Sequence, residues 1–183
     1  MHHHVIHESP RVLYMHVHAH GDAVKLAETV RAAVALTKAP LPAPAAPAPT
    51  PAIALDTAGI AAALGYNGRV NGGVYQTSVP RPETIRIGGM TVPGSMGLGT
   101  VMNFQPTGDG KAAITGDFVL VAREVNPVIR ALRANGITVT SLHNHMLDDE
   151  PRLFFMHFWA NDDAVKLARG LRAGLDSTAM GAR

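Results

Sequence analysis

The sequence predicts an α+β fold, in which an antiparallel or mixed sheet carries helices packed on it, and three observations support this prediction. Glycine-broken runs with alternating β-branched and aromatic residues fill residues 69–121 and 137–160. Segments near 124–135 and 162–175 place apolar residues at helical spacing, which indicates helices with one face on a sheet. The third observation is an internal repeat, which predicts that the strand-loop-strand-helix unit at the end of the chain is repeated at the N-terminus.

The repeat relates the two ends of the chain. Residues 2–37 align without a gap with residues 143–178, and the run DAVKLA occurs in both copies, at 22–27 and at 163–168. Each copy has the pattern of a strand, a loop, a second strand and a helix. Asn161 or Asp162 is the expected N-cap of the helix in the second copy.

The middle of the chain begins with a segment that has no means of forming a core. It alternates alanine and proline, which is typical of a semi-extended linker. The predicted organisation is therefore a C-terminal fragment of a first repeat at 1–37, an Ala/Pro-rich linker at 38–52, a complete domain at 53–178 and a tail at 179–183.

Turn residues divide the complete domain into elements. Gly65 ends a short helix with the sequence LDTAGIAAAL, and the run TGDG is the expected turn of a long hairpin. Gly136 closes the helix that follows that hairpin, and Pro127 is tolerated in the first turn of this helix.

Composition excludes several classes of function. With 16 basic and 14 acidic residues the net charge is only +2, which does not favour nucleic-acid binding. The chain has no cysteine, which excludes disulfides, thiolate metal sites and cysteine nucleophiles. No apolar run approaches the roughly 20 residues of a membrane span, and the sequence as written carries no export signal, so localisation is left unknown.

Three motifs resemble a known family. The runs GGVYQTSVPR, MNFQPTGDGKAAITGDFVL and HNHMLDDEPRLFFMH are similar to the LppY/LpqO family of bacterial domains, over Leu55 to about Ser177. Members of that family carry two such domains in tandem, and residues 2–37 resemble the close of the first. The resemblance implies that the chain starts inside a longer first domain. The counterparts of His2 and His4 in the second copy, His143 and His145, indicate that the leading histidines are native. For intact members the resemblance implies a cell-envelope or secreted location, and it implies a fold more than a chemistry.

Histidine is confined to the two repeat copies. All ten histidines lie there, and none occurs in the roughly hundred residues between them. Three repeat positions are histidine in both copies: His2 and His143, His4 and His145, His16 and His157.

This pattern predicts a metal site on a β-hairpin. His143 and His145 lie two apart on a predicted strand, so their side chains share a face about 7 Å apart. In a bulge-free hairpin with an even register sum His157 shares that face, nearly opposite His143. Three converging imidazoles can bind zinc or copper, and iron is also admissible. The first copy offers a second set, in His2, His4 and His16.

Nearby carboxylates extend the hypothesis towards catalysis. Glu150 or Asp149, in the loop of the second copy, can act as a fourth ligand or as an acid or base for bound water. Asp117 is a candidate to hold the second nitrogen of a histidine. The sequence thus predicts a metal-binding domain with a tris-histidine site, with an enzyme of unknown substrate as one interpretation. The alternative is a non-catalytic, envelope-associated binding or structural module whose histidines serve packing.

The N-terminal hairpin and helix cannot bury their own apolar face. We therefore expect residues 2–37 to dock on the second copy or on a neighbouring chain as a swapped element, which would make a homo-oligomer. The sequence does not identify a small-molecule or cell-wall ligand.

Overall fold

The computed structural model describes residues 3–4, 9, 11–39 and 52–181. It divides the chain into two units, the first comprising Met1 and Met15–Pro49 and the second comprising His2–Tyr14 and Thr50–Arg183. Residues 40–51 of the predicted linker lie outside the described residues. The described elements are α1 (Ala23–Ala35), α2 (Thr57–Leu64), β1 (Arg69–Asn71), β2 (Val74–Pro80), β3 (Arg86–Ile87), β4 (Met90–Thr91), the 3₁₀ turn η1 (Gly94–Met96), β5 (Gly99–Gly108), β6 (Lys111–Val121), α3 (Ala122–Ala134), β7 (Thr138–His143), β8 (Asp149–Glu150), β9 (Leu153–Asp163) and α4 (Ala164–Asp176).

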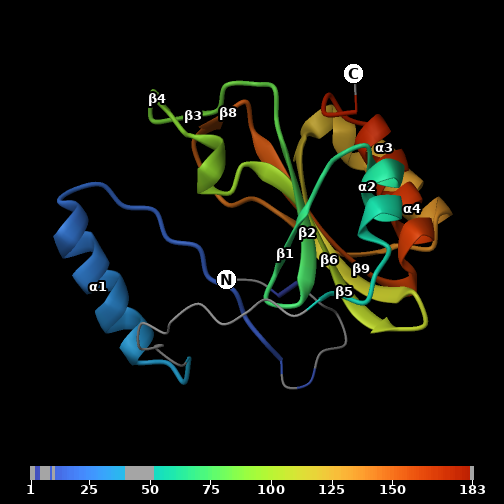
Figure 1. The fold of residues 1–183 in the computed structure, drawn as a ribbon. Coiled ribbons are helices and arrows are strands. Elements are labelled where there is room, and N and C mark those ends of the chain that lie inside the picture. The colour runs from blue at the N-terminus through green and yellow to red at the C-terminus, as the bar shows by residue number, and fades with distance from the viewer. Residues whose placement is uncertain (1–2, 5–8, 10, 40–51, 182–183) are drawn as a thin grey trace. The chain divides into compact units, whose positions relative to one another are not determined.

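The second unit is built on an antiparallel sheet. This confirms the predicted α+β fold, for which the sequence had left an antiparallel or a mixed sheet open. The six strands of the main sheet follow the order β1-β2-β5-β6-β9-β7, and a small sheet follows the order β4-β3-β8. Helices α2, α3 and α4 lie together on one side of the main sheet (Figure 1). The expected helices near 124–135 and 162–175 are α3 and α4.

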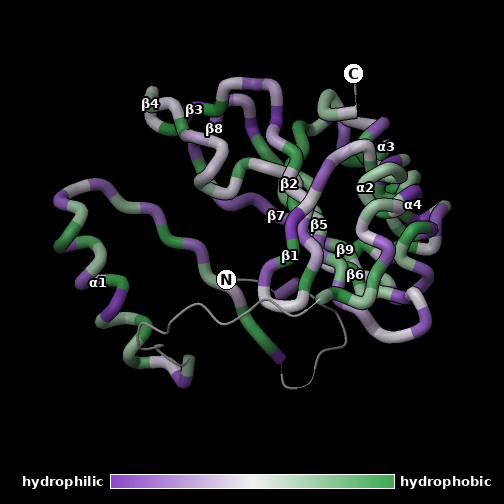
Figure 2. Tube along the Cα trace, in the orientation of Figure 1, coloured by the Kyte–Doolittle hydropathy of each residue, from purple (hydrophilic) through white to green (hydrophobic). Residues whose placement is uncertain are grey.

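The two faces of the main sheet differ because side chains alternate along each strand. Hydrophobic and hydrophilic residues are accordingly interspersed along these strands (Figure 2). On one face Phe104, Ile114, Phe118 and Phe158 are buried in the core that the helices cover. On the other face, which we call the open face, a smaller apolar cluster includes Val119, Val121, Leu153 and Phe155 and packs with Ile85 and Leu98.

Local turn chemistry explains the long hairpin and the short helix. The β5–β6 hairpin turns through Asp109 and Gly110, whose φ angles of 53° and 72° are left-handed, as the run TGDG predicts. Gly65 ends α2 with φ 75°, and its N–H donates to the carbonyl of Ala61.

The N-cap expected for α4 is wrong by one or two residues. Strand β9 continues as far as Asp163, which pairs with Lys111, so Asn161 and Asp162 are still in the sheet. Asp163 is the cap, and its carboxylate accepts the N–H of Lys166 at 2.7 Å.

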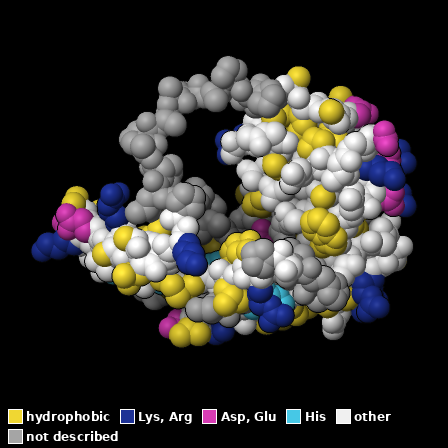
Figure 3. All heavy atoms as spheres, turned by 90° about the horizontal axis from the view of Figure 1, so that it is seen from below, with side chains coloured by type: hydrophobic (Ala, Val, Ile, Leu, Met, Phe, Trp, Pro, Cys, Tyr) yellow, Lys and Arg dark blue, Asp and Glu magenta, His cyan; other side chains and the backbone are white. Residues whose placement is uncertain are grey.

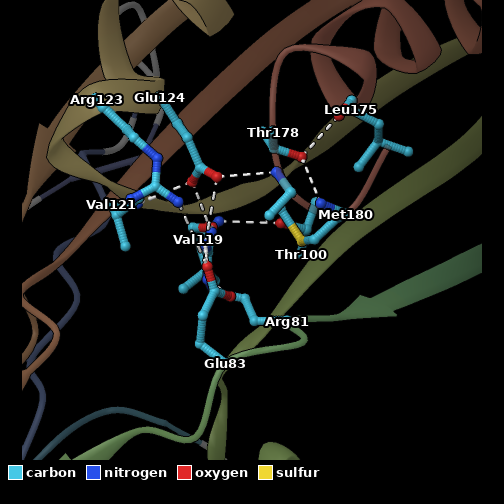
Figure 4. A network of polar contacts seen from close by, with 11 residues as sticks. Arg81, Glu83, Thr100, Val119, Val121, Arg123, Glu124, Leu175, Thr178 and Met180 are labelled. Carbon is cyan, nitrogen blue, oxygen red and sulfur yellow. Dashed lines mark hydrogen bonds and ion pairs between the residues drawn. The ribbon is translucent and has the colours of Figure 1, made fainter. Parts of the chain in front are cut away.

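A buried ion-pair network lies where α3 begins (Figure 4). Arg81, which follows β2, donates to the carbonyl of Val119 at 2.6 Å and to Oε2 of Glu124 at 2.8 Å. The Glu124 carboxylate also accepts the N–H of Val121 at 3.0 Å and the N–H of Ala179 at 2.9 Å. The carboxylate therefore supplies a hydrogen-bond acceptor to the backbone at the start of α3, and it also binds the chain that follows α4. Burial acts to raise the pKa of Glu124, but the hydrogen bonds from Arg81 and the two backbone amides outweigh it and lower that pKa.

The first unit contains one described helix, α1, whose Asp22 cap accepts the N–H of Lys25 at 3.0 Å. No residue of α1 is buried, and hydrophobic side chains lie at the surface of this unit (Figure 3). Residues 11–21 form no strand in the described chain beyond a single bridge residue, Tyr14. The helix of the N-terminal repeat is thus present, and its strand-loop-strand part is not confirmed. Within the described residues, no helix has the length and apolar character that crossing a membrane requires.

Candidate metal centre

His157 occupies the open face of β9. Its neighbours in sequence, Met156 and Phe158, point into the helix-covered core, so the period of two directs His157 to the other side. The side chain is enclosed there, with the residue only 4% exposed.

His143 approaches His157 from the adjacent strand. The register pairs His143 with Phe155 and Ser141 with His157, so His157 lies one diagonal step from His143 and not directly opposite it. The even register sum required for a shared face is present here, and the bulge of β7 lies further back, between Val139 and Ser141. The two imidazole centroids are 4.9 Å apart and the rings are inclined by 15°.

His145 lies beyond the end of β7, so the predicted strand does not extend to it. Its Nε2 nonetheless lies 3.1 Å from Nε2 of His143. Its ring stacks on Phe155, with centroids 3.5 Å apart and planes inclined by 7°. The loop thus returns His145 to the side of His143, although strand geometry does not place it there.

The orientation of His157 is set by a backbone carbonyl. Its Nδ1 lies 3.1 Å from the carbonyl oxygen of Gly116 on β6, which selects the tautomer with hydrogen on Nδ1 and gives Nε2 a lone pair. A Cβ at Gly116 would collide with the carbonyl oxygen of Val101 and would lie 2.9 Å from the ring of Phe158. Glycine is therefore needed at this position. The sequence interpretation chose Asp117 for the role that the neighbouring Gly116 carbonyl performs.

His4 completes a group of three histidines within the second unit. Its ring stacks between Tyr14, at 3.7 Å and 4°, and His157, at 3.5 Å and 20°. Ring nitrogens of His4, His143 and His157 lie within 4.8 Å of one another. The group therefore contains one histidine from the N-terminal repeat copy and two from the complete domain, a combination that the repeat alignment does not indicate.

The other predicted ligands and the two carboxylates do not belong to the group of His4, His143 and His157. His2 is outside the described residues, and His16 is exposed in the first unit. Asp149 is buried in the hairpin loop, where it accepts the N–H of Leu153 at 2.6 Å and lies 3.2 Å from Nε of Arg152. Glu150 is exposed, and it lies opposite Arg86 in the backbone register of β8 and β3 in the small sheet. Among the described residues, neither carboxylate belongs to a group of three or more potential metal ligands.

A hollow of about 300 Å³ opens beside the three histidines. His4, Tyr14, Asn103, Asp117 and His157 are among its lining residues. Asp117 faces His157 across the β6–β9 ladder. Burial raises the pKa of Asp117 to about 7, and backbone hydrogen bonds involving Val101 and its own amide act in the opposite direction.

The arrangement brings together histidines that can hold a metal ion. Imidazole nitrogens bind zinc and copper at about 2.0–2.1 Å, so three such ligands around one ion need to be about 3.4 Å apart. The ring nitrogens of the group lie within 4.8 Å of one another, so the imidazoles would have to draw closer by up to about 1.4 Å to share one ion. Each imidazole must be neutral to bind, and in neutral His157 the Gly116 hydrogen bond leaves Nε2 as the nitrogen with the lone pair.

Comparison with known proteins identifies one family. A family model described as Domain of Unknown Function (DUF1259) matches residues 1–36 and 58–177. This finding corrects the resemblance inferred from the sequence motifs, because the matching family is this one and not the LppY/LpqO family. The envelope or secreted location that the earlier resemblance implied loses its basis with it. No curated protein and no solved structure matches the chain.

Proposed function

The chain belongs to the family described as Domain of Unknown Function (DUF1259), and from this premise we propose that it binds a divalent transition-metal ion through histidines on the open face of the main sheet. The ligands are His143 and His157, with His4 as the third. One observation supports the proposal above all others: ring nitrogens from these three residues lie within 4.8 Å of one another.

The surroundings of these three histidines suit a metal site built from neutral imidazole nitrogens. His157 is buried and donates to a carbonyl through Nδ1, which is the usual way in which a metal-binding histidine is oriented. No thiolate is available from this sequence. Nitrogen ligands of this kind favour zinc or copper, and ferrous iron is compatible.

The identity of the third ligand has two candidates. The hairpin set predicted from the sequence takes His145, whose Nε2 is 3.1 Å from that of His143. We favour His4, because it belongs to a group of three potential ligands with His143 and His157, whereas no such group among the described residues contains both His145 and His157.

The test is metal stoichiometry in the full chain prepared without an affinity tag. We expect one equivalent of Zn²⁺ or Cu²⁺ by elemental analysis and calorimetry, and loss of that equivalent in a His143→Ala, His157→Ala double variant. A His18→Ala, His20→Ala double variant is the matched control, because these two exposed histidines contact each other in the first unit. A wild-type protein that binds no stoichiometric metal, or a control variant that loses as much, would reject the proposal.

Single variants decide the third ligand. His4→Ala is expected to weaken binding by at least about tenfold, and His145→Ala to weaken it much less. The reverse order would favour the hairpin set of His143, His145 and His157.

A non-catalytic module whose histidines serve packing is the second candidate. The stacked pairs His4–Tyr14 and His145–Phe155 favour it, because such contacts stabilise a fold without any ion. In that case His145→Ala would lower the unfolding temperature of metal-free protein, and added metal would not raise the unfolding temperature of the wild type. Catalysis with Glu150 or Asp149 as acid or base stays a prediction.

Self-association is a further part of the proposal. In the repeat alignment the half-buried Leu26 and Val34 of α1 correspond to the buried Leu167 and Leu175 of α4. We infer that this face of α1 packs on a neighbouring chain, which would form a homo-oligomer. Light scattering on the full chain tests this: a monomer at all accessible concentrations would contradict it.

A further inference from the structure

A second hollow lies on the open face of the main sheet, beside the one that contains His157. It measures about 360 Å³ and is formed by residues from five strands, β1, β2, β5, β6 and β9. Asn103 and Thr115 line both hollows, so the two are adjacent. A volume of this order is within the range of small-molecule sites. We call it the amide hollow after its lining.

The polar groups of the amide hollow are neutral. Side-chain amides of Asn71, Gln76, Asn103 and Gln105 line it together with the hydroxyl of Thr115. Nε2 of Gln76 donates to Oδ1 of Asn103 at 2.8 Å, which fixes the two amides relative to each other. Each amide retains further donor and acceptor capacity, because this bond uses one donor of one and one lone pair of the other.

No charged side chain is among the described residues that line the amide hollow. A charged ligand would lose hydration there without gaining an opposite charge, which is unfavourable. A ligand made mostly of apolar atoms would leave the amides unpaired. The lining therefore selects a neutral molecule with many groups that both donate and accept.

Trp159 forms one wall of the amide hollow. It lies on β9 opposite Thr115, and 37% of its surface is exposed, which is unusual for the largest aromatic side chain in a sheet. An exposed indole next to fixed amides offers an apolar plane and polar partners in one site. The ring of a sugar has the complementary form, with C–H groups on its faces and hydroxyls at its edge.

We propose that the amide hollow binds a neutral oligosaccharide, with one sugar ring on Trp159 and the hydroxyls of a following ring bonded to Gln76 and Asn103. This inference goes beyond metal binding and does not require the ion, because none of these three residues belongs to the histidine group.

Trp159 supplies the test, because it is the only tryptophan in the chain. The full chain is titrated with maltotriose, cellotriose and tri-N-acetylchitotriose, and with the anionic trigalacturonate, in the presence of EDTA. We expect a saturable change in Trp159 emission with at least one neutral trisaccharide and none with trigalacturonate. The same affinity is expected in the His143→Ala, His157→Ala variant, which separates this site from the metal site.

Variants assign the contacts by calorimetry, with folding checked by circular dichroism. Gln76→Ala and Asn103→Ala are each expected to weaken binding about fivefold or more, and Trp159→Ala to abolish it. Asn126→Ala is the matched control, since this amide is exposed on α3, on the other side of the sheet. Failure of all three neutral trisaccharides, equal binding of trigalacturonate, or an equal loss in Asn126→Ala would each overturn the proposal.

Discussion

Helices α1 and α4 share a sequence motif but not an environment. Both follow an aspartate cap that accepts the N–H of the lysine three residues later, Lys25 in α1 and Lys166 in α4. Both end in a turn built on a threonine: Thr37 donates to Val34, and Thr178 donates to Leu175. The hydrogen bonds of the cap and of the final turn in one copy therefore have their equivalents in the other.

Burial distinguishes the two helices. Leu167, Ala168, Leu171 and Leu175 are buried in α4, whereas no residue of α1 is buried. The chain after α4 is also held by the Glu124 carboxylate, which is not a local contact. Short-range sequence thus determines where a helix starts and stops, while its contribution to stability depends on the surface that it covers.

The largest expected loss comes from breaking the long-range contact that follows α4. Glu124→Ala leaves the buried Arg81 guanidinium with the Glu83 carboxylate alone in place of two carboxylates, and it frees the N–H groups of Val121 and Ala179. We expect a destabilisation of about 3–5 kcal/mol in urea denaturation. Glu28→Ala on α1, an exposed glutamate, is the control and should change stability by less than about 0.5 kcal/mol. Equal effects would mean that the network adds nothing to the fold.

Leucine occupies the same repeat position in α1 and α4, so its replacement gives the most direct comparison of the two helices. Leu167→Ala should cost about 2–5 kcal/mol, because this side chain is only 2% exposed in the core. Leu26→Ala, its equivalent in α1, should cost less than about 0.5 kcal/mol in a dilute monomer. A larger cost that grows with protein concentration would indicate that α1 packs on a neighbouring chain.

A smaller change is expected from titrating Glu124 without replacing it. Its pKa is lower in the folded state than in the unfolded state, so its contribution to stability is fully present above its usual pKa of about 4.5. That contribution is lost as the pH falls below this value and through the lowered pKa. Unfolding measured from pH 6 to pH 3 should show this loss in the wild type and a shallower dependence in Glu124→Gln. Parallel curves would contradict the assignment.

The smallest effect is expected at the two helix caps. Asp163→Ala removes the side-chain acceptor for Lys166 and should lower the free energy of unfolding by about 1 kcal/mol. Asp22→Ala removes the same bond from α1 and should reduce helical circular dichroism without changing the unfolding midpoint of the second unit. A shift of that midpoint by Asp22→Ala would show that the two units unfold together.

The sequence predicts those parts of the fold that depend on local chemistry. The TGDG turn, the end of α2 at Gly65 and the helices of both repeat copies need only their own residues and were predicted on that basis. The extent of β9 was missed, because it depends on the pairing of Asp163 with Lys111 of another strand. The strand pattern of the N-terminal copy was also not confirmed, because a strand is stable only against a partner.

The candidate site was likewise predicted only in the part that depends on residues close together in the sequence. Alternation along the chain predicted a shared face for His143 and His157 on the condition of an even register sum, and the structure has that register. Two further features, the carbonyl of Gly116 and the ring of His4, come from distant parts of the sequence and have no signal in the spacing of histidines. A glycine in the middle of a strand that otherwise alternates is the one available indication, since it marks a close backbone approach.

The position of β9 between β6 and β7 has a consequence for the order of folding. The β5–β6 hairpin closes a short loop and can form early, and the β7–β9 pair closes another. The two pairs join only when β9 docks on β6, and that step brings His157 to the carbonyl of Gly116. His4, from the opposite end of the chain, can join only afterwards. Metal affinity is therefore expected to develop in the last phase of refolding, and a colorimetric metal indicator in a stopped-flow experiment would time it.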